Sequence, residues 1–129
     1  MRDIEYFPAT NPDLPFSLAV RCENVIYLSG QIGRGADGAL ASGFDAQAAQ
    51  ALDNIAAVLQ RTGASMSDAF KFTIMLADMA TWPAFNRVYV TYFDRTRLPA
   101  RSAFGCSGLA AGALLEIECW AYAPVAGKG

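Results

Sequence analysis

The chain has 129 residues, of which 53% are hydrophobic and 17% charged, with a formal net charge of −2 and no histidine. This length predicts one domain over residues 1–129, and a charged fraction below the usual ~25% favours self-association, which would cover apolar surface. The acidic balance without a basic run argues against nucleic acid as a partner, and no apolar run reaches the roughly 18 residues of a membrane span.

The first part of the chain predicts three strands. Residues 4–7 could form a short edge strand that ends at Pro8, and a loop rich in turn-forming residues follows. Residues 16–21 and 25–28 alternate as two strands of a hairpin, and residues 29–33 are expected to leave the second strand as a turn. The N-terminus lacks the apolar core of a signal peptide, so a cytoplasmic location is expected.

Residues 45–61 form the clearest predicted helix. Apolar residues at helical spacing predict one buried side, and Gly63 is a suitable stop. That side is expected to comprise Ala46, Ala49, Leu52, Ile55, Ala56 and Leu59. Residues 70–76 predict a strand that is apolar on both faces, typical of a strand that is central or covered by another subunit.

A second helix is expected from an N-cap at Thr81 to about residue 93. Its apolar side would carry Ala84, Val88 and Tyr92, with Phe85 and Tyr89 flanking them.

The C-terminal part predicts two more strands, at residues 103–106 and 114–122. After the edge strand, the order β-β-α-β-α-β-β favours an α+β fold, a mixed sheet with two helices packed on one face. In the last strand one set of residues should pack on the helices: Leu115, Ile117, Cys119 and Ala121. The other set combines acids and large aromatics, as in a cleft wall or a subunit interface: Glu116, Glu118, Trp120 and Tyr122.

Arg101 and Glu116 are the two residues best suited to chemistry. Arg101 follows Pro99 and could clamp a carboxylate with two parallel hydrogen bonds, and the two strands could bring it near an acid. The alternative for Arg101 is a structural salt bridge to Glu116 or Glu118. Glu116 could orient or deprotonate a water molecule, and its alternative is a solvated strand carboxylate.

The other candidates carry weaker signals. Ser29 and Gly30 could offer a hydroxyl and bare backbone N–H groups to a ligand, or form an ordinary turn, and Asn86 could be an exposed helix residue. Cys106 is a weak nucleophile candidate because no histidine can activate it. The three cysteines, Cys22, Cys106 and Cys119, are expected to be reduced thiols, and neither a metal site nor a cofactor is expected.

Several short motifs together resemble the RidA/YjgF family, the reactive enamine/imine deaminases that are also called endoribonuclease L-PSP proteins. The resemblance covers about residues 14–123, and the motifs occur in the family's order and spacing. They are Pro15-Phe16-Ser17, Tyr27-Leu28-Ser29-Gly30-Gln31-Ile32, Gln50-Ala51-Leu52-Asp53-Asn54-Ile55, Asn86-Arg87-Val88-Tyr89, Pro99-Ala100-Arg101-Ser102 and Leu115-Glu116-Ile117-Glu118.

The resemblance implies a chorismate-mutase-like fold and a homotrimer, whose sheets form a central barrel with three clefts between subunits. It implies that Arg101 holds the substrate carboxylate and that Glu116 positions the attacking water. Ser29, Gly30 and Asn86 would line the pocket.

This chain departs from the family pattern at three positions. Phe16 stands where many members have tyrosine, Ala103 where several have cysteine, and Gly105 where many have an acid. Phe16 and Ala103 are still expected to line the substrate pocket, with altered polarity.

The expected function is hydrolysis of small 2-imino or enamine acids, such as 2-iminopropanoate and 2-iminobutanoate, to 2-keto acids and ammonia. One alternative is a pathway-specific deaminase of the aminomuconate or aminoacrylate type. Another is a ligand-binding or chaperone-like protein without turnover. A ribonuclease role is least favoured because the chain is acidic and has no histidine.

Overall fold

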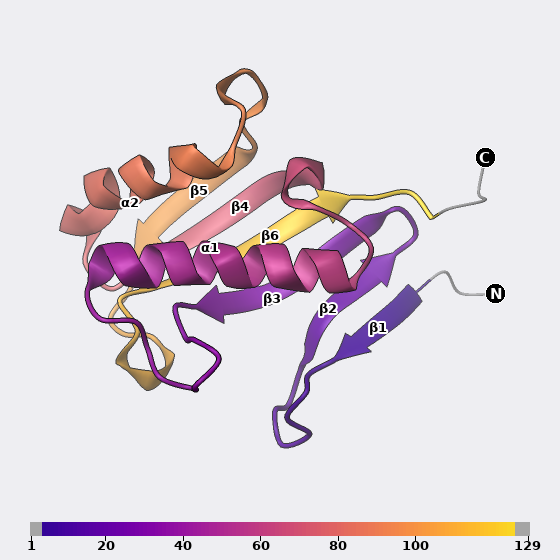
Figure 1. The fold of residues 1–129 in the computed structure, drawn as a ribbon, viewed down its shortest axis with the longest axis horizontal. Helices are drawn as coiled ribbons and strands as arrows, with labels where there is room; N and C mark the ends of the chain where they lie inside the picture. Colours follow the sequence, from indigo (N-terminus) through magenta and orange to yellow (C-terminus); the bar gives the residue numbers. More distant parts are fainter. Residues whose placement is uncertain (1–3, 126–129) are drawn as a thin grey trace.

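The computed structural model describes residues 4–125, which form a six-stranded sheet with two α-helices (Figure 1). The elements are β1 (Ile4–Pro8), β2 (Ser17–Cys22), β3 (Val25–Ile32), α1 (Phe44–Arg61), β4 (Ala69–Leu76), α2 (Trp82–Tyr89), β5 (Ala100–Gly105) and β6 (Leu115–Tyr122). Within this described part, no helix is both long and apolar enough to cross a membrane.

The strands lie in the order β1-β2-β3-β6-β4-β5. The neighbours are antiparallel except β4 and β5, which run parallel. Both helices lie on the same face of the sheet, with α1 across β3 and β6 and α2 nearer β4 and β5 (Figure 1). The expected α+β arrangement of two helices on one face of a mixed sheet is therefore confirmed.

The core lies between the helices and the sheet. The side of α1 that packs on the sheet is apolar apart from Gln47, and its buried residues are Gln47, Ala48, Ala51, Leu52, Ile55, Val58 and Leu59. Beyond α1, Gly63 takes φ +90, the left-handed conformation that glycine accepts without strain. The alternation predicted for the last strand is also confirmed: Leu115, Ile117, Cys119 and Ala121 are fully buried.

The opposite face of the sheet carries aromatic side chains that one chain leaves exposed. The ring of Trp120 lies 5.3 Å from that of Tyr27 and 6.4 Å from that of Phe70, centre to centre. Trp120 is 39% exposed, and Tyr122 is 53% exposed. A group of exposed aromatic side chains on one face is typical of an interaction face.

The second helix begins where the sequence predicted, with Thr81 at the N-cap position, but it differs from the prediction in its capping and in its buried side. A 3₁₀ turn at Met79–Thr81 precedes it and is capped by Asp78, whose side chain accepts a hydrogen bond from the Ala80 N–H. Thr81 already has helical dihedral angles and makes no capping bond, because that turn supplies the start.

The buried residues of α2 are Phe85 and Tyr89, rather than the Ala84 and Val88 side. The helix ends at Tyr89, and a 3₁₀ turn at Val90–Tyr92 follows it. The two aromatic rings offer more apolar area to the sheet than alanine and valine do, which accounts for the rotation of the helix.

Two strands are longer than the sequence suggested. β3 continues to Ile32 because it stays paired with β6 beyond an irregularity between Leu28 and Gln31. β5 begins at Ala100 because it pairs in parallel with β4, so Arg101 lies in the strand rather than before it.

Candidate active site

Arg101 lies on the helix-covered face of the sheet. It is opposite Phe72 in the parallel pairing of β5 with β4, and opposed residues in such a pair project to the same face. Phe72 is fully buried beneath the helices, and Arg101 reaches α2 above it. Since β5 is the last strand of the sheet, Arg101 lies beside an open edge.

Three residues of α2 hold the Arg101 guanidinium. Its Nη2 donates a hydrogen bond of 2.6 Å to the Asn86 side-chain oxygen. Its Cζ lies 4.7 Å from the ring centre of Tyr89 and 5.6 Å from that of Phe85. The helical spacing of residues 85, 86 and 89 places all three on one side. We call Arg101 and these three residues the anchor group.

Asn86 is therefore a partner of Arg101 rather than a solvent-exposed helix residue. Sequence motifs identified Asn86 and Arg101 as two separate candidates, and only the packing of α2 over β5 brings their side chains together. Ala103 follows on the same face as Arg101, opposite Ile74, and packs against the core.

Glu116 lies on the other face of the sheet. Its neighbours Leu115 and Ile117 point to the helices and are fully buried, so the alternation of β6 turns Glu116 away from them. Burial raises the pKa of the Glu116 carboxyl above its ordinary value, and the negative charge of Glu118 adds to the rise. A raised pKa brings a carboxylate closer to the range in which it can accept and return a proton near neutral pH.

Gly30 provides the space for the Glu116 carboxylate. A Cβ atom at position 30 would stand 2.0 Å from Glu116 Oε2, so only glycine leaves room for the carboxylate as it lies. The adjoining Ser29 donates a hydrogen bond of 2.6 Å to the Ser17 carbonyl oxygen, which ties β3 to the start of β2. We call Glu116, Gly30 and Ser29 the Glu116 cluster.

Phe16 immediately precedes β2 and is 49% exposed. It is next to Ser17, the residue that Ser29 binds. Its ring is thus available to a ligand or to another subunit.

A single chain does not bring the anchor group and the Glu116 cluster together. Arg101 and Glu116 lie on opposite faces of the sheet, with β4 between their strands. Two strand spacings and an offset of three residues along β4 put their Cα atoms roughly 14 Å apart. The salt bridge from Arg101 to Glu116 or Glu118, the alternative that the sequence left open, is not formed within residues 4–125, where the ion pair present joins Arg21 and Glu5.

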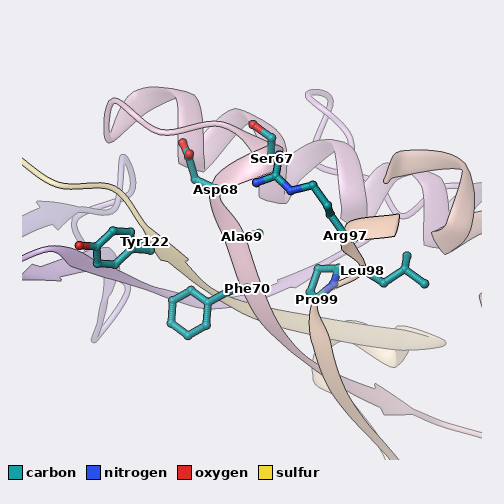
Figure 2. Close-up of a pocket in the computed structure, with 8 residues that line it drawn as sticks. All are labelled: Ser67, Asp68, Ala69, Phe70, Arg97, Leu98, Pro99 and Tyr122. Carbon is teal, nitrogen blue, oxygen red and sulfur yellow. The ribbon is translucent and has the colours of Figure 1, made fainter. Parts of the chain in front are cut away.

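A cavity in the described part of the chain belongs to neither group. It measures about 380 Å³ and lies near the starts of β4 and β5 (Figure 2). Its lining residues are Ser67, Asp68, Ala69, Phe70, Arg97, Leu98, Pro99 and Tyr122. None of them was a predicted site residue, although Pro99 belongs to one of the family motifs and Tyr122 to the predicted cleft or interface face of the last strand.

The cysteines are unpaired, as expected. Cys22 is exposed, Cys106 is half-buried with its thiol 3.5 Å from the Leu76 carbonyl oxygen, and Cys119 is buried. Burial raises the pKa of the Cys119 thiol to about 12, so this thiol stays protonated and unreactive at neutral pH. Within residues 4–125, no three histidine, cysteine, aspartate or glutamate residues cluster as metal ligands.

Comparison with known proteins gives consistent results. The family model described as Endoribonuclease L-PSP matches residues 8–123. A mouse protein (Mus musculus) named 2-iminobutanoate/2-iminopropanoate deaminase is 39% identical over 106 residues, which cover 81% of this chain and 78% of the mouse protein. The human protein of the same name is also 39% identical over 106 residues, covering 81% of this chain and 77% of its own length.

A solved structure supports the same assignment. The crystal structure of RidA from an Antarctic Psychrobacter bacterium superposes with a TM-score of 0.82 at 35% identity, covering 91% of this chain and 94% of that one. The fold implied by the family resemblance is therefore confirmed, whereas the trimer stays a prediction.

Proposed function

The chain belongs to the endoribonuclease L-PSP family, which includes the RidA deaminases, and we propose that it hydrolyses small 2-imino acids to 2-keto acids and ammonia. Relatives that are 39% identical are named for this activity on 2-iminobutanoate and 2-iminopropanoate. Proteins of the same family thus carry out this chemistry at a level of identity that makes it the leading hypothesis for this chain.

The observation that carries the proposal is the state of Arg101. Its guanidinium is fixed by Asn86 and the rings of α2, while no carboxylate of residues 4–125 pairs with it. A guanidinium has five N–H donors, so donors remain for a ligand. A positioned, unneutralised guanidinium at an open sheet edge suits a substrate that carries a carboxylate, and a 2-imino acid does.

The proposed reaction adds water to the C=N bond. The Arg101 guanidinium binds the substrate carboxylate, and the Glu116 carboxylate orients a water molecule and accepts a proton as the water oxygen bonds to the imine carbon. Glu116 returns that proton to nitrogen, and as the C–N bond breaks and the carbonyl forms, the remaining O–H proton passes to the Glu116 carboxylate and then to solvent, so that the 2-keto acid and ammonia leave. The substrate brings its own electrophilic, protonated nitrogen, so the protein supplies mainly position and one proton acceptor.

We propose that the complete site forms between two copies of the chain. Arg101 and Glu116 face opposite sides of one sheet, so one substrate can meet both only if a second chain supplies one of them. The exposed aromatic face around Trp120 gives a surface on which copies could assemble, in agreement with the homotrimer that the resemblance implies. Phe16, Ser29, Gly30 and Ala103 are assigned to the walls of this shared site.

The pathway-specific alternative rests on the differences near the anchor. A Cβ at Gly105 would stand 2.9 Å from Met79 Cγ, so Met79 occupies the space where many family members have an acidic side chain. Together with Phe16, this makes the predicted pocket more apolar, which would favour a larger or less polar imine over the smallest ones.

A panel of imines formed in situ by an amino-acid oxidase tests the proposal. We expect the wild-type protein to accelerate release of the 2-keto acid, and Arg101→Lys to lose nearly all of that effect, since lysine keeps the charge but not the two-pronged geometry. The relative rates across the panel distinguish small from larger apolar imines. If wild-type protein leaves every imine at its rate in buffer while binding 2-keto acids, the chain is a ligand-binding protein. If Arg101→Lys matches wild type, Arg101 is structural.

A further inference from the structure

From the packing of Arg101 on α2, we infer that Tyr89 is a positioning residue whose ring face orients the guanidinium toward an anionic ligand. The inference rests on the proposed role of Arg101 as the carboxylate anchor. The Tyr89 ring centre is 4.7 Å from Arg101 Cζ, nearer than that of Phe85 at 5.6 Å. The ring's negative face attracts the cation that lies over it.

The contacts of Arg101 leave a defined direction for a ligand. The two rings lie against the guanidinium, and Asn86 takes the hydrogen bond from Nη2. A planar guanidinium donates its hydrogen bonds in its own plane, so the donors that Asn86 does not use extend past the rings. Fixing that plane before the ligand arrives lowers the ordering cost of binding.

Tyr89 is rigid enough to do this. It is only 3% exposed, and its ring packs edge-on against Phe72 at 5.5 Å and beside Phe93 at 4.7 Å. These rings belong to β4 and to the residues after α2, so the orientation of Tyr89 is set by the core rather than by the ligand.

The ring of Tyr89, rather than its hydroxyl, does the positioning. The hydroxyl oxygen is buried and has no hydrogen-bond partner among the described residues. Burial also raises the pKa of the Tyr89 phenol to about 12 despite the nearby Arg101 charge, so the phenol neither gains nor loses a proton in ordinary assays. Phenylalanine should therefore replace tyrosine here, whereas an aliphatic residue should not.

Three variants separate this role from general packing. Tyr89→Leu removes the ring over Arg101, Tyr89→Phe keeps it, and Phe93→Leu removes a ring that packs on Tyr89 and Phe72 in the same cluster. The readouts are kcat and KM for an imine, the Kd for pyruvate from calorimetry, and the ¹⁵N signals of the Arg101 side chain, assigned with Arg101→Lys.

Tyr89→Leu is expected to weaken pyruvate binding and raise KM about threefold to tenfold, the range of a partly desolvated cation–π contact. Its kcat should fall less, because the carboxylate is held in both the ground state and the transition state. Rotation of the Arg101 guanidinium should become faster. Tyr89→Phe should match wild type, and Phe93→Leu should lose stability while freeing the Arg101 guanidinium much less than Tyr89→Leu does, because the ring over Arg101 remains.

Fluorinated phenylalanines at position 89 provide a test that does not depend on Tyr89→Leu folding. Tetrafluoro- and pentafluorophenylalanine keep the ring's shape and remove its negative face, so guanidinium mobility should rise with fluorine content relative to phenylalanine. Equal mobility across this series would overturn the inference. So would a Phe93→Leu variant that frees the guanidinium as much as Tyr89→Leu does, or failure of Tyr89→Phe to behave like wild type.

The two proposals can fail separately. If the protein hydrolyses no imine but the Arg101 signals still depend on the ring at position 89, the proposed reaction is wrong and the positioning role stands. If imine hydrolysis requires Arg101 but neither KM nor guanidinium mobility responds at position 89, the positioning role is wrong and the reaction stands.

Discussion

Gly30→Ala offers a direct test of the proposed role of Glu116, because it moves that carboxylate without altering it chemically. The new Cβ would stand 2.0 Å from Glu116 Oε2, 2.8 Å from Cδ and 3.0 Å from Cγ. These atoms end a flexible side chain, so the carboxylate can move away while the strands stay in place. Since β3 and β6 remain paired on either side of position 30, the change should be local.

The size of the effect follows from the distances. Oε2 must retreat by about 1 Å to reach the 3.0 Å that real Cβ contacts respect. A displacement of about 1 Å of a positioned catalytic group costs on the order of 10²-fold in rate, so kcat/KM should fall by about that factor. Stability should change little, because Gly→Ala at an ordinary φ contributes roughly 0.4–1 kcal/mol of stabilisation, which offsets the cost of displacing the carboxylate.

The assay compares kcat/KM for 2-iminopropanoate with the urea midpoint of the same preparation. Gly108→Ala is the matched control, since nothing lies within 4 Å of a Cβ built there, and it should keep full activity. Glu116→Gln and the double variant Gly30→Ala/Glu116→Gln complete a cycle. If Gly30→Ala acts through Glu116, the double variant should be no worse than Glu116→Gln alone. Full activity in Gly30→Ala, or a further loss in the double variant, would refute the role we assign to this carboxylate.

Three further predictions concern the carboxylates and the assembly. Glu116→Gln should lower the rate of imine hydrolysis by roughly 10²-fold or more, whereas Glu118→Gln, about 7 Å further along the same face, should lower it much less; equal losses would indicate general electrostatics. Folding raises the pKa of Glu116 above 4.5, so between 4.5 and the raised value the folded chain keeps a proton that the unfolded chain has lost. Urea titrations should therefore show that the free energy of unfolding of wild type falls, relative to that of Glu116→Gln, as the pH rises through this range. A slope of the opposite sign would contradict the argument that burial raises this pKa. Light scattering at micromolar concentration should give three times the 13.8 kDa chain mass, and a monomer would leave Trp120 exposed to water and the shared site unformed.

Alternation in the sequence predicted the buried side of β6 correctly, because a period of two separates Leu115 and Ile117 from Glu116. The prediction for α1 was only partly right: Leu52, Ile55 and Leu59 are buried as expected, but Ala46 is exposed. Alanines lie on both the buried and the exposed sides of α1, so the helical period alone could not fix the centre of its buried side.

The same approach failed for α2 and for the ends of β3 and β5. The helix α2 has only 8 residues, and aromatic residues fall on both of its candidate sides, so pattern alone could not select Phe85 and Tyr89. β3 runs through Gly30, which looks like a turn residue in sequence but lies in the strand, because β3 stays paired with β6 beyond it.

The sequence alone determined the fold class, the residue types available for chemistry without histidine, and, through its motifs, the family to which the chain belongs. It could not determine that Arg101 and Glu116 face opposite sides of the sheet. A period of two shows which residues of one strand share a face of the sheet. Whether residues of two different strands share a face depends on which strands pair and in what register. Here β4 lies between β5 and β6, and its parallel pairing with β5 sets Arg101 beside Phe72, beneath α2. Only the tertiary structure therefore shows that the anchor group and the Glu116 cluster lie on opposite faces of the sheet.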